Sequence, residues 1–162
     1  MLAEKGFQVT ALDVSETALG ALNRRVHEEE LPNVSIVWHQ MQELPFVSDY
    51  FDAVVSTNVI HHGKSREIRG TLAEMRRVLR KRGHGFIVVL SKKDFRLGKG
   101  RQLEPRTYVF TRGEEKGITH HFFEEEELRA YLKNFEIVSI TEELLRVPGG
   151  HRAHFHAVVR KP

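Results

Sequence analysis

The first feature with chemical potential is a single acid at the end of an apolar segment. Asp13 follows Val9-Thr10-Ala11-Leu12, a run that is apolar on both faces, as expected of a buried parallel strand. In open α/β sheets ligands bind outside the carboxyl ends of the strands, where a carboxylate can accept hydrogen bonds from both hydroxyls of a nucleotide ribose. Asp13 can instead cap the helix that begins near Ser15. The residues alone leave both interpretations open.

Histidines form a second feature, because four of the ten lie in two adjacent pairs, His61-His62 and His120-His121. Imidazole is a common metal ligand. Adjacent residues, however, rarely bind one ion well, no carboxylate lies beside them at helical spacing, and the chain has no cysteine to supply a thiolate. We therefore predict no metal site. The imidazoles either orient a substrate or accept a proton, or they serve in packing and capping.

A long polar segment, residues 92–119, carries the third feature. It is basic and contains glycines, and only residues 107–110 have an extended pattern. A segment of this length with little structure of its own is more often a functional lid than a plain connection. Arg106 in this segment can recognise a carboxylate or phosphate, or it can belong to a solvated basic surface. We expect the segment to cover a crevice, with Tyr108, His120 and His121 turned toward it.

The elements that must position these residues alternate along the chain. Apolar and β-branched runs predict strands at 8–14, 34–38, 51–57, 86–90, 135–141 and 154–160. Helical spacing predicts helices at 16–30, from Ser65 to a stop at Gly83 and Gly85, and at 123–133. This order predicts an α/β fold with a doubly wound parallel sheet in one domain, residues 1–162. The turn Pro148-Gly149-Gly150 favours an antiparallel pair at the end of the chain.

Composition limits the classes of function. The net charge of +3 is mild and dispersed, so it does not call for a nucleic-acid partner. The apolar runs have the length of strands, which predicts no signal peptide and no membrane span. The absence of cysteine fits a reducing compartment, and we expect a cytoplasmic protein.

Three segments together resemble one family. The segment 6–15, Gly-Phe-Gln-Val-Thr-Ala-Leu-Asp-Val-Ser, resembles the second-strand segment of class I S-adenosylmethionine-dependent methyltransferases, particularly the small-molecule group that includes quinone-biosynthesis enzymes. Leu44-Pro45-Phe46 with 51–56 resembles the segment leading into that group's fourth strand. Arg77-Val78-Leu79 resembles the segment before its fifth strand. The three occur in the family's order over nearly the whole chain. The resemblance implies a Rossmann-like sheet, mostly parallel with an antiparallel C-terminal strand.

The resemblance also implies roles for individual residues. The cofactor would be S-adenosylmethionine and the substrate a small molecule. The expected cofactor-binding residues are Asp13 and Val14 at the ribose, Gln40 and Met41 around the adenine, and Thr57 and Asn58 toward the methionine end. The expected substrate residues are His62, Arg106, Tyr108, His120 and His121. No obligatory catalytic residue follows, because the sulfonium is already activated and alignment is the main requirement.

Departures from the family pattern leave alternatives open. Gln40 replaces the usual acid at the adenine, and Lys81-Arg82-Gly83 replaces Pro-Gly-Gly. The family's first strand and its glycine-rich loop are missing, and we expect them to lie upstream of Met1 or to be absent. A homo-oligomer that fills the missing strand is one expected solution, and weak cofactor binding is another consequence. The competing functions are a cofactor-free interaction module and, less favoured, a nicotinamide-dependent oxidoreductase.

Overall fold

The computed structural model describes residues 2–162, and the chain forms two compact units, one up to Pro45 and one from Phe46 to Pro162. Each unit is described by itself, and the single-domain organisation stays a prediction. No helix in residues 2–162 combines the length and the apolar composition that a membrane span requires.

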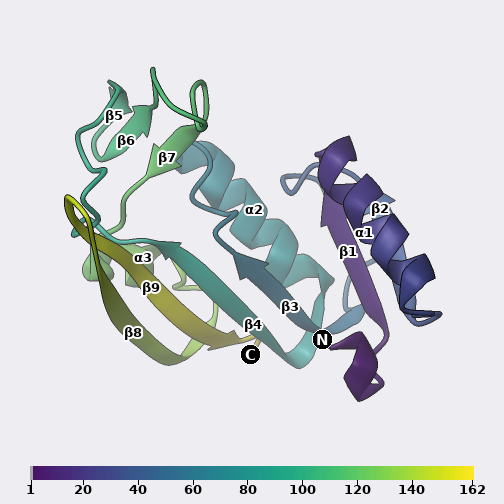
Figure 1. Ribbon diagram of the computed structural model, residues 1–162. Coiled ribbons are helices and arrows are strands. Elements are labelled where there is room, and N and C mark those ends of the chain that lie inside the picture. Colours follow the sequence, from purple (N-terminus) through teal and green to yellow (C-terminus); the bar gives the residue numbers. More distant parts are fainter. Residues whose placement is uncertain (1) are drawn as a thin grey trace. The chain divides into compact units, whose positions relative to one another are not determined.

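The first unit is a small α/β layer. It contains a 3₁₀ turn η1 (Ala3–Lys5), strand β1 (Val9–Asp13), helix α1 (Glu16–Glu28) and strand β2 (Val34–Trp38). β1 and β2 pair in parallel, with Val9 opposite Val34 and Asp13 opposite Trp38 (Figure 1). The predicted parallel strands and the helix between them are therefore confirmed. η1 ends at Gly6, whose φ of +84° favours glycine.

Helix α1 begins as its sequence predicts. The Ser15 hydroxyl accepts a hydrogen bond from the Ala18 N–H at 3.2 Å, which satisfies one of the free N–H groups of the first turn. The helix ends at Glu28, two residues before the predicted end. Its last turns close with the Leu31 N–H donating to the Val26 carbonyl at 3.0 Å.

The second unit contains the larger sheet. Its elements in chain order are β3 (Phe51–Thr57), α2 (Ser65–Val78), β4 (Leu79–Leu90), β5 (Arg101–Glu104), β6 (Thr107–Val109), β7 (Thr119–His121), α3 (Glu125–Tyr131), β8 (Glu136–Val147) and β9 (Gly150–Arg160). Four strands form a sheet in the order β3-β4-β9-β8 (Figure 1). β3 is parallel to β4, and β9 is antiparallel to both of its neighbours. The prediction of a mostly parallel sheet with an antiparallel C-terminal strand is confirmed.

The core of this unit lies between the sheet and helices α2 and α3. One face of α2 is buried, as the helical spacing predicts, and α3 adds Leu128 and Tyr131 to the same cluster. The buried residues of α2 are Ile68, Thr71, Leu72, Met75 and Val78. Phe123 and Leu132 are fully buried in this cluster beside Val159 of β9. Burial of these side chains fixes the helices over the sheet, with each contributing about 1.5–3 kcal/mol.

The boundary between α2 and β4 differs from the prediction. We expected Gly83 and Gly85 to end the helix and the strand to begin at Phe86, but the helix ends at Val78 and β4 begins at Leu79. Leu79 is extended and fully buried, so the chain leaves the helix there to place this side chain in the core. The glycines lie within β4, where they allow close packing.

Gly85 provides a test of that packing. A Cβ atom at this position would lie 2.4 Å from Met75 Cε and 2.8 Å from Val159 Cγ2. Met75 can move, but the β-branched Val159 is stiff, so we expect Gly85→Ala to lower the free energy of unfolding by about 1–3 kcal/mol. Gly70→Ala is the matched control, because Gly70 lies in α2 with open space around its Cβ position and should gain about 0.5–1 kcal/mol. Urea denaturation measures both, and an unchanged Gly85→Ala variant would contradict the packing argument.

The segment 92–119 has more structure than predicted. β5, β6 and β7 form a three-stranded antiparallel sheet, so the expectation of little structure is wrong, whereas the extended piece at 107–110 is confirmed as β6. Phe110 and Phe122 pack beneath this sheet with Leu90 and supply the apolar cluster that a short sheet needs. Its action as a lid stays a prediction.

Candidate functional site

Asp13 lies at the carboxyl end of β1, as predicted, and is half-buried. Its Oδ1 atom accepts a hydrogen bond from the Ser15 N–H at 2.8 Å. Oδ2 has no hydrogen-bond partner among residues 2–162. The carboxylate therefore stabilises the turn into α1 with one oxygen and leaves the other for a ligand, so the two interpretations from the sequence are compatible.

The other residues of the first unit that were predicted to bind the nucleoside part of the cofactor lie just after β1 and β2. The Val14 carbonyl accepts a hydrogen bond from Trp38 Nε1 at 3.0 Å, and the Asp13 carbonyl accepts from the His39 N–H at 3.2 Å. Gln40 is exposed and Met41 is half-buried just beyond β2. The ends of β1 and β2 thus place one carboxylate, one amide and one thioether in the same small layer.

In the second unit, Thr57 is the last residue of strand β3, and Asn58 follows it. Thr57 pairs with Val88 of β4, and the Asn58 N–H donates to the Val88 carbonyl at 3.0 Å. Asn58 has a φ of +57°, a left-handed conformation that asparagine tolerates better than most residues. Both side chains are exposed, so they are available to a ligand at the carboxyl end of β3.

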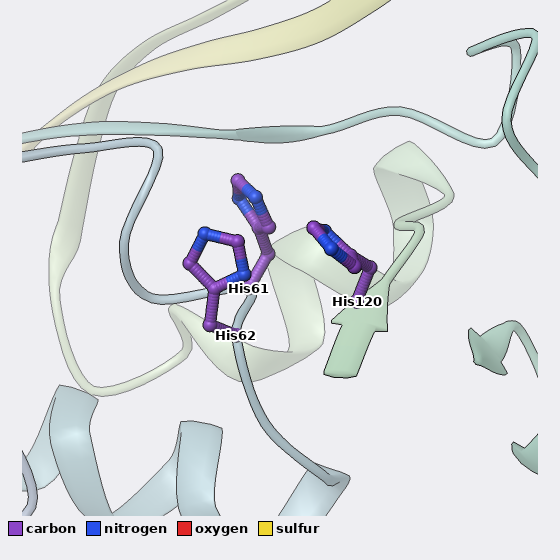
Figure 2. Close-up of side chains that lie close together, drawn as sticks. All are labelled: His61, His62 and His120. Carbon is purple, nitrogen blue, oxygen red and sulfur yellow. The ribbon is translucent and has the colours of Figure 1, made fainter. Parts of the chain in front are cut away.

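Three histidines converge in the second unit. His61 and His62 lie in the turn that follows β3, and His120 lies in the middle of β7 (Figure 2). The ring centroids are 4.4 Å apart for His61 and His62 and 4.7 Å apart for His62 and His120. The predicted substrate residues His62 and His120 are therefore brought together, with His61 as a third member.

Burial sets the charge of this cluster. His61 and His120 are buried, and burial, followed by the imidazoles of His62 and His120, lowers the pKa of His61 well below its ordinary value. Burial, followed by the effect of His62, lowers the pKa of His120 to about 4. His61 and His120 are thus neutral at pH 7. The imidazole of His120 is a poor proton acceptor there, and it is better suited to holding a ligand than to general-base catalysis.

His121 points away from this cluster. Its Nε2–H donates to Glu127 Oε2 at 3.2 Å, which leaves Nδ1 to accept from the Thr107 hydroxyl at 2.8 Å. Burial lowers the pKa of His121 against the opposing effect of the Glu127 carboxylate. Arg106 Nη2 lies 3.0 Å from the same carboxylate. Both predicted substrate residues are therefore bound to Glu127 in this structure.

The geometry of strand β7 explains why His120 and His121 lie in different surroundings. Successive side chains of a strand point to opposite faces, so His120 and His121 cannot serve one site together. Tyr108 lies opposite His120 across β6 and β7, and Thr107 lies opposite His121. Tyr108 thus shares the face of His120, half-buried, with its ring centroid 6.2 Å from that of Phe122. The five predicted substrate residues form two groups, and only His62, Tyr108 and His120 belong to the first.

A family model described as a methyltransferase domain matches residues 1–83, which is just over half of the 162-residue chain. The chain belongs to the methyltransferase domain family. The predicted recognition of this family is confirmed, and the nicotinamide-dependent alternative is not supported. No curated protein matches the chain.

Solved structures of methyltransferases share the fold of this methyltransferase domain. A structure of a SAM-dependent methyltransferase from Methanosarcina mazei matches with a TM-score of 0.80 and 22% identity, covering 99% of this chain and 84% of that one. A protein from Pyrococcus horikoshii matches with a TM-score of 0.78 and 20% identity, covering 99% and 74%. The 1,6-didemethyltoxoflavin-N1-methyltransferase of Burkholderia thailandensis, whose structure contains S-adenosylhomocysteine, matches with a TM-score of 0.71 and 24% identity, covering 98% and 63%.

One ion pair near the histidines of this methyltransferase domain was not predicted. Asp94 is buried and accepts hydrogen bonds from Arg96 Nε at 2.8 Å and from the Ala153 N–H at 3.1 Å. Arg96 also lies 3.5 Å from Glu115, whose carboxylate is 3.7 Å from His120 Nε2. In the sequence Asp94 and Arg96 lie in a polar run between lysines, where nothing distinguishes them from solvated charges. Only the return of β9 beside β4 buries them.

Proposed function

We propose that this methyltransferase domain transfers a methyl group from S-adenosylmethionine to a small-molecule acceptor. The observation that carries the proposal is the Asp13 carboxylate, which keeps one oxygen without a hydrogen-bond partner at the carboxyl end of a parallel strand. A ribose offers two hydroxyl donors that suit such an acceptor. Membership of the methyltransferase family and a bound S-adenosylhomocysteine in one structural neighbour support the choice of cofactor.

The residues present fit a nucleoside in the first unit. Asp13 would accept from the ribose, with the exposed Val14 beside it. The Gln40 side chain would accept from the exocyclic amine of the adenine, and Met41 would contact the ring. When bound, the cofactor supplies an activated methyl group on a sulfonium. The task of the chain is then to hold donor and acceptor in line and to exclude water.

In the second unit we assign Thr57 and Asn58 to the methionine end and His62, Tyr108 and His120 to the acceptor. The neutral imidazole of His120 can hydrogen-bond an acceptor without repelling a positively charged donor. Arg106 and His121 also remain proposed substrate residues. Both would have to exchange their contacts with Glu127 for contacts with a substrate.

We further propose that the 162-residue chain binds the cofactor weakly, with a dissociation constant of about 1 mM, equivalent to about −4 kcal/mol. Residues 2–162 contain no glycine-rich loop between a strand and a helix, and Gly6 serves the end of η1 instead. In related folds the backbone N–H groups of such a loop bind an anionic group of the ligand, and the corresponding group of S-adenosylmethionine would be its methionine carboxylate. A homo-oligomer stays a prediction, which light scattering can test.

The decisive experiment is a titration of S-adenosylmethionine followed by backbone amide NMR. We expect saturable shifts at Asp13 and in the segment after β2. Asp13→Asn keeps the acceptor for the Ser15 N–H but removes the charge, so it should weaken binding at least about tenfold, the equivalent of one charge-assisted hydrogen bond.

Glu16→Gln is the matched control, because it removes a neighbouring charge in the first turn of α1 and should leave the affinity within about twofold. Equal affinities for Asp13→Asn and the parent chain would remove the ribose role of Asp13. No saturable binding by the parent chain would favour the cofactor-free interaction module, and micromolar binding would contradict the proposed impairment.

A further inference from the structure

The cluster of His61, His62 and His120 has an arrangement that substrate binding alone does not explain. One ligand nitrogen from each residue lies within 4.8 Å of the other two. Figure 2 shows the three rings gathered between the turn after β3 and strand β7. Consecutive side chains in a turn do not alternate as they do in a strand, and the tilted rings of His61 and His62 are 4.4 Å apart. This geometry removes the objection that adjacent histidines cannot share one ligand.

The cluster also has unsatisfied polar atoms. His61 is 3% exposed and His120 is 0% exposed. His61 Nδ1 and both ring nitrogens of His120 are buried and have no hydrogen-bond partner among residues 2–162. The nearest acid, Glu115, is 3.7 Å from His120 Nε2, which is too far for a hydrogen bond. A neutral imidazole has one N–H and one lone pair, so His120 has one free lone pair and His61 can offer another; a metal ion is one ligand that would accept both.

One ring nitrogen of His62 is already held by the backbone. Its Nδ1 lies 3.3 Å from the Thr119 carbonyl oxygen. A carbonyl can only accept, so in the neutral ring Nδ1 carries the proton and Nε2 keeps its lone pair free for a ligand. Metal-bound histidines usually donate their second ring N–H to a carbonyl or carboxylate in this way, which fixes the tautomer and the ring orientation.

We propose that His61, His62 and His120 bind one divalent transition-metal ion through neutral imidazole nitrogens. Nitrogen ligands favour zinc, cobalt, nickel or copper over magnesium and calcium. Nitrogens bound to tetrahedral zinc at 2.0–2.1 Å are about 3.3 Å apart, so rotations of the side chains that move each nitrogen by about 1 Å would close the site. Three protein ligands leave a fourth position open to water or to an oxygen atom of a small molecule. Binding of the metal does not depend on methyl transfer.

The test uses zinc and cobalt on the full chain after removal of bound metal by a chelator. We expect calorimetry to give one zinc ion per chain. Cobalt should produce visible absorption bands that zinc abolishes by displacement. His62→Gln should weaken zinc binding at least about tenfold, and His120→Ala should do the same. His84→Gln is the matched control, because His84 is an exposed histidine of β4 outside the cluster and its loss should leave binding unchanged.

Folding is monitored by circular dichroism. His120 is fully buried, so His120→Ala can unfold the chain; in that case His62→Gln, which alters a half-buried side chain, carries the test. Stoichiometric binding that is lost in the cluster variant and kept in His84→Gln supports the proposal. Absent or non-stoichiometric binding overturns it, as does equal binding by His62→Gln and the parent chain. None of these readouts requires cofactor or activity, so they are independent of the titration that tests methyl transfer.

Discussion

Replacing Asp94 by alanine is expected to lower the free energy of unfolding by about 3–5 kcal/mol, the cost of leaving one partner of a buried ion pair without the other. The Asp94 side chain is fully buried, and that of Arg96 is 17% exposed. Asp94 accepts from Arg96 Nε and Nη2 at 2.8 and 3.1 Å, and from the Ala153 N–H of β9 at 3.1 Å. The variant would leave a guanidinium and a buried N–H without their acceptor. Urea denaturation measures the loss.

An exposed pair of the same chemical type provides the control. Asp52 pairs with Arg80, but the Asp52 side chain is 72% exposed. Water and salt screen such a pair, so Asp52→Ala should change the free energy of unfolding by no more than about 1 kcal/mol. Equal effects of Asp94→Ala and Asp52→Ala would show that burial contributes nothing to the first pair.

The Asp94 carboxylate also predicts how the stability of the fold depends on pH. Burial raises the pKa of Asp94, but the hydrogen bonds from Arg96 and from the Ala153 N–H outweigh it, and the net pKa is lowered. A carboxyl whose pKa is lower in the folded state stabilises the fold fully above its unfolded pKa of about 3.9. This stabilisation is lost as the pH falls through the lower folded value. The difference in melting temperature between the parent chain and Asp94→Asn should therefore shrink below about pH 4.

The local parts of the fold follow from the sequence, whereas the parts set by distant contacts do not. The runs 34–38 and 51–57 are strands with the predicted bounds, because a β-branched apolar run between breakers leaves few alternatives. The start of β4 was missed because glycines normally end helices. Here Gly85 lies in a strand because Met75 and Val159 approach it closely. That approach depends on β9, about seventy residues further along the chain.

The candidate sites also differ in whether they depend on local sequence or on distant contacts. Asp13 could be placed because its strand and its helix cap adjoin it in the sequence. The histidine cluster could not, because His120 comes from a separate small sheet that the segment 92–119 was not expected to form. The separation of His120 from His121 follows from strand alternation once β7 is known. The sequence prediction considered each adjacent pair of histidines separately. It therefore did not foresee that His120 would lie beside His61 and His62.

The largest effects on packing are expected at two adjacent phenylalanines. Phe122 and Phe123 are both fully buried, because the segment between β7 and α3 is covered on both sides. Phe123 packs in the main core, with its ring perpendicular to that of Tyr131 at a centroid distance of 5.5 Å. Phe122 packs with Leu90 and Phe110 beneath the small sheet. Truncation of a buried phenylalanine leaves a cavity, so Phe122→Ala and Phe123→Ala should each cost about 3–5 kcal/mol.

The two variants should differ in which part of the chain opens. Phe123→Ala removes contacts to α2 and α3, so amide hydrogen exchange should accelerate throughout the second unit. Phe122→Ala removes the support of Phe110, whose ring stacks on His120 at 4.2 Å, so exchange should accelerate mainly in residues 101–121. Phe86→Ala is the control, because this β4 side chain is 43% exposed and its truncation should cost less than about 1 kcal/mol. A uniform acceleration in Phe122→Ala would mean that the small sheet unfolds only with the whole unit. A local one would identify residues 101–121, which include His120, as a separately opening element, which is the property that a lid requires.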